Sequence, residues 1–176
     1  MTNMWQPVAS KELIYSRARM LKSMRAFFDE RGVIEVESPL LSSACTTDPN
    51  LDSLETEFQS KPYYLNTSPE FFMKRMLAIY RQPIYQICKS FRDDELGPNH
   101  NPEFTMLEWY RPDMSYHQLM DEVAELWQSL VGEAEVDEPL AIEGAGHGLE
   151  DFNPTLVVLD QVVVGGEDRG DLALAR

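Results

Sequence analysis

Four alternating residues between positions 103 and 111 carry side chains that could bind a small charged ligand. Every second side chain of an extended strand shares a face, so Phe104, Met106, Glu108 and Tyr110 are expected to point the same way. An aromatic ring, a carboxylate and a phenol on one face suit a pocket that stacks a flat ring at one end and binds an amine at the other. The same pattern is also typical of a surface hairpin with solvated charges.

Further polar side chains precede this strand. Arg92 ends a strand predicted over residues 84–92, and its guanidinium matches phosphate or carboxylate groups through paired hydrogen bonds. His100 and Asn101 follow in a polar loop and can donate hydrogen bonds to a phosphate or a purine. Two strands of about nine residues around such a loop predict a long antiparallel hairpin.

Glu70 is another candidate, at the start of a helix predicted to run to about Tyr80. Ser68 before Pro69 is typical of a helix start, with a hydroxyl cap followed by proline at the first helical position. The helix dipole favours a carboxylate at this point in any case. Glu70 therefore fits a helix-start role as well as a ligand-binding role.

These candidates are held by elements that hydropathy periodicity predicts. A helix over residues 11–30 has one apolar stripe, and Gly32 follows in a position that favours a left-handed cap. A half-buried strand with Ile34 and Val36 inward is ended by Pro39, and residues 42–53 read as a loop. Shorter strands are predicted over 54–58 and 63–65. The stripe of the first helix consists of Ile14, Ala18, Leu21, Met24 and Phe28.

A third helix follows the hairpin. Ser115 and Gln118 fit a capping box, and the helix behind them is expected to end at Gly132. Its predicted buried stripe is Met120, Val123, Trp127 and Leu130.

The 176 residues are enough for one globular domain with a substantial core. Residues 1–112 hold 13 basic and 15 acidic side chains, a net charge of −2, whereas residues 113–176 hold 2 and 15, a net charge of −13. Without clustered lysine and arginine, tRNA binding is not expected.

There is no apolar run of about 20 residues and no signal-peptide pattern, so we expect a cytoplasmic protein that does not enter a membrane. Two cysteines and three scattered histidines predict no metal site.

The composition changes near the end of the chain. Residues 132–176 hold seven of the nine glycines and no lysine, and residues 156–164 form a nearly continuous apolar run that reads as a buried strand or an aggregation-prone segment. We therefore predict a boundary between residues 1–139 and an acidic, glycine-rich segment over 140–176. A shifted reading frame and a disordered tail are the two interpretations of this segment.

Three segments of the chain, in the same order as in the family, resemble class II aminoacyl-tRNA synthetases. Residues 31–39 resemble motif 1, which builds the dimer interface of that family. Residues 91–95 and 100–110 resemble motif 2 of the lysyl branch, and residues 67–75 are similar to its amino-acid-binding helix. The resemblance implies an α+β fold, with the family's antiparallel sheet and flanking helices. It does not extend past about residue 140, so we expect the sheet to be incomplete, with motif 3 and the acidic pair that binds Mg²⁺ outside this chain.

The resemblance also implies roles for single residues. Arg92 is expected to be catalytic, holding the α-phosphate of ATP and the substrate carboxylate in position. The expected ATP-binding residues are Arg92, Asp93, Asp94, His100, Asn101 and Phe104, the last stacking on adenine. The expected ligands of a lysine-like amino acid are Ser68, Pro69, Glu70, Glu108 and Tyr110.

Within the lysyl branch, the chain is most similar to paralogues that lack the anticodon-binding domain. The resemblance to them implies ATP-dependent activation of (R)-β-lysine as an adenylate and its transfer to a lysine of elongation factor P, by a homodimer formed through the motif 1 region. Two alternatives stay open: a catalytic fragment of a lysyl-tRNA synthetase, and a non-catalytic module that binds ATP or pairs with a synthetase-like partner. Without motif 3 we expect weak or absent catalysis and low solubility.

Overall fold

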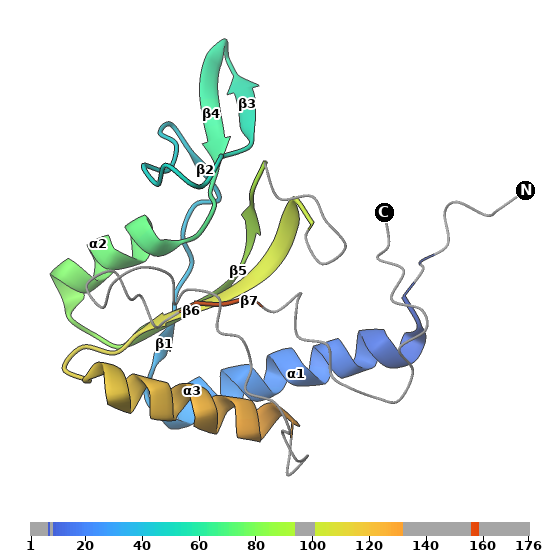
Figure 1. Cartoon of the computed structure of the whole chain (residues 1–176), viewed down its shortest axis with the longest axis vertical. Helices are drawn as coiled ribbons and strands as arrows, with labels where there is room; N and C mark the ends of the chain where they lie inside the picture. The colour runs from blue at the N-terminus through green and yellow to red at the C-terminus, as the bar shows by residue number, and fades with distance from the viewer. Residues whose placement is uncertain (1–6, 8, 94–100, 132–155, 159–176) are drawn as a thin grey trace, which may run out of the picture.

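The computed structural model describes residues 7, 9–93, 101–131 and 156–158. A four-stranded sheet lies at the centre, in the order β1 (Ile34–Glu35), β5 (Ile84–Phe91), β6 (Glu103–Tyr110) and β7 (Leu156–Val158). β1 is parallel to β5, and the other neighbours are antiparallel. Helices α1 (Lys11–Glu30) and α3 (Tyr116–Val131) lie side by side along one side of this sheet, and α2 (Glu70–Tyr80) lies on the other (Figure 1). The predicted α+β class with an antiparallel sheet and flanking helices is confirmed.

The predicted hairpin is formed by β5 and β6, which pair along their full length from Ile84–Tyr110 to Phe91–Glu103. Because side chains alternate along a strand, the odd- and even-numbered residues point to opposite faces. Seven consecutive residues of β6, from Phe104 to Tyr110, are buried. The interpretation of this segment as a solvated surface hairpin is therefore wrong.

The odd-numbered face holds the main core. Tyr85, Leu107 and Trp109 pack against Met24, Phe27 and Phe28 of α1 and against Leu119 and Leu126 of α3. The Phe28 and Tyr85 rings are stacked with their centroids 4.4 Å apart. This packing fixes the hairpin from one side and leaves the even-numbered face to be covered by other elements.

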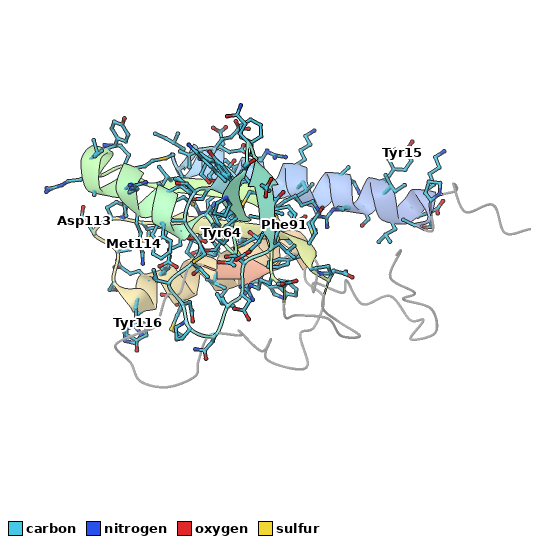
Figure 2. The ribbon with its side chains drawn as sticks, turned by 90° about the horizontal axis from the view of Figure 1, so that it is seen from above. Tyr15, Tyr64, Phe91, Asp113, Met114 and Tyr116 are labelled. Atoms are coloured by element: carbon cyan, nitrogen blue, oxygen red, sulfur yellow. The ribbon has the colours of Figure 1, made fainter. Side chains whose placement is uncertain are left out.

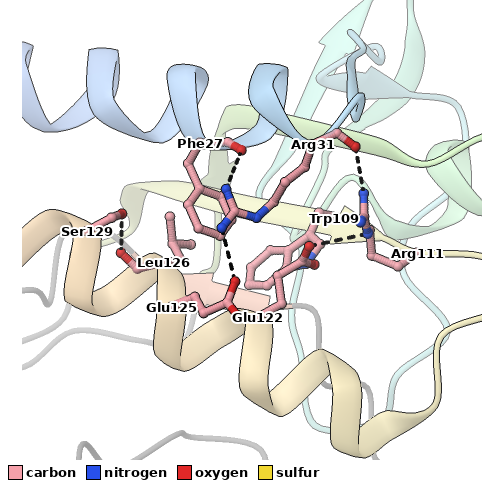
Figure 3. Close-up of polar contacts among 8 residues, drawn as sticks. All are labelled: Phe27, Arg31, Trp109, Arg111, Glu122, Glu125, Leu126 and Ser129. Carbon is pink, nitrogen blue, oxygen red and sulfur yellow. Dashed lines mark hydrogen bonds and ion pairs between the residues drawn. The ribbon is translucent and has the colours of Figure 1, made fainter.

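Polar contacts bind α3 to the sheet and to the end of α1 (Figure 3). Glu122 is 4% exposed; it accepts a hydrogen bond of 2.9 Å from the Trp109 indole and pairs with Arg111 Nε at 3.3 Å. Arg31, which follows α1, pairs with Glu125 at 3.0 Å. The buried carboxylate of Glu122 is thus satisfied by two partners.

The even-numbered face meets α2 at one end, where Ile84 and Tyr110 pack with Met73. A separate three-stranded sheet lies above α2 in Figure 1, in the order β2 (Leu41–Ser42), β4 (Lys61–Leu65) and β3 (Glu55–Phe58). β2 falls at the start of a segment predicted to be a loop. It forms because its two residues pair with Leu65 and Tyr64, a long-range contact that local composition does not encode.

Several sequence predictions of caps and ends are confirmed. α1 spans the predicted residues, and Gly32 behind it has a φ of +65°. Ser115 and Gln118 form the expected capping box, with the Ser115 N–H donating to Gln118 Oε1 at 2.8 Å. Of the apolar run over 156–164, residues 156–158 form β7 against β6, and the remainder lies outside the described residues, as do Gly132 and the predicted boundary at 139.

Other predictions of burial are wrong. On α3 the buried residues are Leu119, Glu122 and Leu126, so the buried stripe is rotated by about one residue from the predicted one, and Met120 is 45% exposed. The first turns of α1 project past the packed side chains around Tyr15 (Figure 2), which leaves Ile14 53% exposed. Ala18, the next residue of the predicted stripe, is exposed as well.

The first strand and the start of α2 also differ from the prediction. β1 is only two residues long, and Ile34 is exposed because Val33 is the residue that enters the core. α2 has Pro69 as its N-cap rather than as its first helical residue, although Ser68 Oγ still accepts from the Glu70 N–H at 3.4 Å. In the described part of the chain, no helix is both long and apolar enough to cross a bilayer.

Candidate active site

The even-numbered face of the hairpin brings the candidate residues of β6 together with those of β5 and α2. The cross-strand neighbours are Phe104 with Ser90, Met106 with Cys88, Glu108 with Gln86 and Tyr110 with Ile84. Arg92 follows β5 at one end of this face, and α2 contacts the opposite end. Arg92 lies six positions after Gln86, which corresponds to roughly 20 Å between their backbones in an extended chain.

Glu108 lies near the α2 end and is fully buried, at 0% exposure. Its Oε1 accepts a hydrogen bond of 2.5 Å from the Tyr110 hydroxyl. Burial raises the pKa of Glu108 to about 7; the Tyr110 hydrogen bond lowers it, the charge of Glu70 raises it, and Lys74 lowers it. Glu70 and Glu108 are therefore close enough to interact electrostatically.

Glu70 and Lys74 form an ion pair across one turn of α2. Lys74 pairs with Glu70 and acts on Glu108 only through its charge, so the cluster carries excess negative charge when Glu108 is ionised. Such a cluster suits a cationic ligand.

Arg92 and Phe104 meet near the opposite end of the face. The Arg92 guanidinium lies 5.1 Å from the centre of the Phe104 ring, and the backbone N–H of Arg92 donates to the Pro102 carbonyl at 3.0 Å. Phe104 is 5% exposed, and Arg92 is half-buried. A guanidinium over an aromatic ring is a stable pair that still presents N–H donors to an anion.

The other predicted site residues have less defined surroundings. Pro69 is buried, Ser68 and Asn101 are half-buried, and Asp93 is exposed, with its N–H donating to the Asp52 carbonyl at 3.0 Å. Asp94 and His100 lie outside the described residues.

Two buried polar residues of this region were not among the predicted site residues. Gln86 lies directly across from Glu108 and is 3% exposed. Asn66, which precedes Ser68, has side-chain atoms buried without a hydrogen-bond partner among the described residues. The signal for Gln86 was its position in the hairpin register; for Asn66, local sequence carries no comparable signal.

A groove of about 610 Å³ lies elsewhere, between the end of α1 and β1. Its polar lining includes Arg25, Glu35 and Tyr85, which are joined through Glu35 by contacts of 3.1 and 3.0 Å. None of the predicted ATP or amino-acid ligands lines it.

The model of the family "tRNA synthetases class II (D, K and N)" matches residues 3–155. The chain belongs to this family. The three blocks that resemble class II synthetases, at residues 31–39, 67–75 and 91–110, all lie within the matched range.

Three curated relatives to which the chain is similar have the same name. An elongation factor P–(R)-β-lysine ligase of Photobacterium profundum is 52% identical over 134 residues, which are 73% of this chain and 42% of the relative. The ligase of Salmonella gallinarum is 44% identical over 159 residues, 87% of this chain and 49% of the relative. That of Actinobacillus succinogenes is 47% identical over 133 residues, 72% of this chain and 41% of the relative. The chain spans less than half the length of these relatives.

Synthetase-like ligases use ATP, and the Arg92–Phe104 pair offers donors for a phosphate beside an aromatic ring. The Mg²⁺ that commonly accompanies ATP finds no prepared site in the described ranges, where no group of three or more His, Cys, Asp or Glu side chains is arranged to hold a metal ion.

Proposed function

We propose that this chain belongs to a cytoplasmic ligase that activates (R)-β-lysine with ATP and transfers it to a lysine side chain of elongation factor P. The observation that carries the proposal is the common name of relatives that are 44–52% identical over most of this chain. The charge of the site supports it, since a doubly cationic amino acid requires carboxylate partners.

The amino-acid end of the site is proposed at α2 and the second half of β6. Glu108 and Glu70 attract the ammonium groups of the substrate, and the Tyr110 hydroxyl holds the Glu108 carboxylate in one orientation. Ser68 and Pro69 shape the start of α2 beside them. An ammonium held by a buried carboxylate forms a charge-assisted hydrogen bond, which is stronger than a neutral one.

The nucleotide end is proposed around Arg92 and Phe104. Phe104 provides the ring for adenine, while Asn101, Asp93 and, from the sequence, Asp94 and His100 supply polar contacts to ATP. Arg92 holds the α-phosphate against the substrate carboxylate. A carboxylate oxygen then attacks the α-phosphorus, the bond from this phosphorus to the bridging oxygen breaks, and pyrophosphate leaves. Positioning and fixed positive charge supply the catalysis.

The transfer step uses the activated carbonyl. The lysine amine of elongation factor P attacks it, and AMP leaves with the carbonyl–oxygen bond electrons. We further propose that the chain forms a homodimer through residues 31–39.

Amino-acid-dependent exchange between ATP and labelled pyrophosphate tests the activation step. Because motif 3 is not found in this chain, we expect weak exchange with (R)-β-lysine, above that with α-lysine or no amino acid. Arg92→Ala is expected to lower it roughly 10²–10³-fold. Arg19→Ala, an exposed arginine of α1, is the control and is expected to retain the exchange rate. Absence of exchange from a sample that unfolds cooperatively would overturn the proposal for this chain.

A second assay separates the acceptors. The chain is incubated with ATP, (R)-β-lysine and either elongation factor P or lysine tRNA, and the products are analysed by mass spectrometry and acid gel electrophoresis. Modification of elongation factor P alone supports the proposed function, and charging of tRNA alone identifies a lysyl-tRNA synthetase fragment.

A further inference from the structure

Two buried acceptor oxygens lie on neighbouring strands of the site without a donor. Gln86 and Glu108 are directly opposite in the β5–β6 register and are 3% and 0% exposed. Gln86 Oε1 and Glu108 Oε2 both lack a hydrogen-bond partner among the described residues. A buried acceptor without a donor lowers the stability of the folded chain, and a carboxylate oxygen without one lowers it more. When Glu108 is ionised, the site is therefore short of hydrogen-bond donors.

The polar groups around this pair are engaged elsewhere. The Tyr110 hydroxyl donates to the other oxygen of Glu108, at 2.5 Å. The Lys74 ammonium pairs with Glu70. Burial raises the pKa of the Cys88 thiol, and an interaction with the side chain of Gln86 lowers it in part. What fits the two free oxygens is thus a group that only donates hydrogen bonds and carries positive charge. A primary ammonium, with three N–H donors and no acceptor, has these properties.

We propose that Gln86 is a specificity-determining residue, which together with Glu108 binds the primary ammonium at the end of the substrate's side chain. The inference rests on the proposed function for the identity of the substrate. Glu108 supplies the opposite charge, and Gln86 supplies a second, neutral acceptor at a fixed place on the adjacent strand. Two fixed acceptors select an ammonium that carries hydrogens over one whose hydrogens are replaced by methyl groups.

The pair can be probed without the activation reaction. n-Butylammonium has the alkyl chain and the primary ammonium of such a side chain but no carboxylate, and butyltrimethylammonium is the matched cation without N–H donors. We expect n-butylammonium to shift the side-chain NH₂ resonance of Gln86 in the ¹⁵N–¹H NMR spectrum in a saturable manner, and butyltrimethylammonium to leave it unchanged. Equal shifts with both cations, or none with either, would overturn the proposal even if pyrophosphate exchange is observed.

Variants of Gln86 then test the binding of amino acids, which is measured by calorimetry. Gln86→Leu keeps the size of the side chain and removes the acceptor, and we expect it to weaken (R)-β-lysine binding about tenfold, the effect of one hydrogen bond to a charged group. Binding of 3-aminohexanoate, which lacks the terminal amine, is expected to stay unchanged, as is binding of ATP. Gln86→Glu retains an acceptor and is expected to bind (R)-β-lysine at least as tightly as the original chain. Gln128→Leu, the same change on α3 away from the site, is the control.

The outcomes distinguish a failure of the proposed function from a failure of the proposed role of Gln86. Saturable binding of n-butylammonium without pyrophosphate exchange supports the role of Gln86 and contradicts the proposed function. A Gln86→Leu variant that loses stability but binds both amino acids as before assigns the two oxygens to a bound water molecule and overturns the proposal. If Gln86→Leu does not fold, Gln86→Glu and the NMR titration of the unmodified chain still decide it.

Discussion

Tyr110 donates a hydrogen bond of 2.5 Å to Glu108, two residues away on the same face of β6, and thereby orients a carboxylate that is completely buried. Only one oxygen of Glu108 is used in this contact, and the other, also buried, has no hydrogen-bond partner among the described residues. Tyr110 also has a structural role, because its side chain packs with Ile84 and Met73 beneath α2.

The buried carboxylate of Glu108 predicts that stability falls as the pH rises. Its pKa is about 7 in the folded chain against an ordinary value of 4.5, so the folded state binds the proton more tightly. The proton-bound form favours folding below pH 4.5, and this advantage is lost as the pH rises to about 7. The loss is on the order of 3 kcal/mol, from the size of the shift.

Glu108→Gln removes this titration and keeps an acceptor for Tyr110. We expect its free energy of unfolding to exceed that of the original chain at pH 8 and to match it near pH 5, as measured by urea denaturation. Glu57→Gln, an exposed change in β3, is the control and should keep the original pH dependence. Parallel pH profiles for the original chain and Glu108→Gln would contradict the prediction.

Glu122 and Glu125 on α3 should differ strongly in their contribution to stability. Glu122→Ala leaves Arg111 without its ion-pair partner and the Trp109 indole without an acceptor in a buried setting, which is expected to cost about 3–5 kcal/mol. Glu125→Ala breaks an ion pair with Arg31 in which the carboxylate is 58% exposed, and is expected to cost less than about 1 kcal/mol. Urea denaturation of both variants at one pH provides the comparison, and similar losses would be inconsistent with it.

Gly32 is predicted to be required for its backbone conformation alone. Its φ is +65°, and a Cβ at this position would meet no atom within 4 Å. Gly32→Ala is therefore expected to lower the free energy of unfolding by about 1 kcal/mol through backbone strain. Gly32→Asn should recover part of this loss, because asparagine tolerates the left-handed region. An unchanged midpoint of thermal unfolding in Gly32→Ala would disprove the strain.

The two cysteines should differ in reactivity. Burial raises the pKa of the Cys88 thiol to about 11, whereas Cys45 is exposed. In a chain with Cys45→Ser, the remaining Cys88 is expected to react with a disulfide reagent at pH 8 at least ~50-fold more slowly than Cys45 does in a Cys88→Ser chain, since the thiolate is the reactive form. The rates should become equal in denaturant. Equal rates in the native state would mean that the face of the hairpin holding Cys88 is open to solvent.

Sequence patterns predicted the elements better than their faces. The period of α1, the capping box of α3 and the alternation of β6 are local signals, and the structure confirms them. The buried stripe of α3 was misassigned because Glu122 counts as polar in any pattern, while its partners Trp109 and Arg111 are set by tertiary structure. Glu122 is buried because these distant partners satisfy its carboxylate.

The candidate site shows the same division. Residue types marked Glu108, Tyr110 and Arg92 as candidates, and the resemblance to a family assigned their roles. Gln86 shares a strand face with Arg92 by alternation alone, but only the cross-strand register sets it opposite Glu108. The register follows from how the whole hairpin pairs, which no short segment determines.

The alternation along β6 also ties folding to site formation. Trp109 and Leu107 fill the core on one face, while Glu108 and Tyr110 stand on the other. A slip of one residue in the pairing with β5 would exchange the two sets, driving a carboxylate among the phenylalanines of α1 and a tryptophan into the polar face. Misaligned pairings are thus excluded by the core itself. A molecule that has packed Trp109 in the core has therefore also placed Glu108 and Tyr110 together on the opposite face of the hairpin.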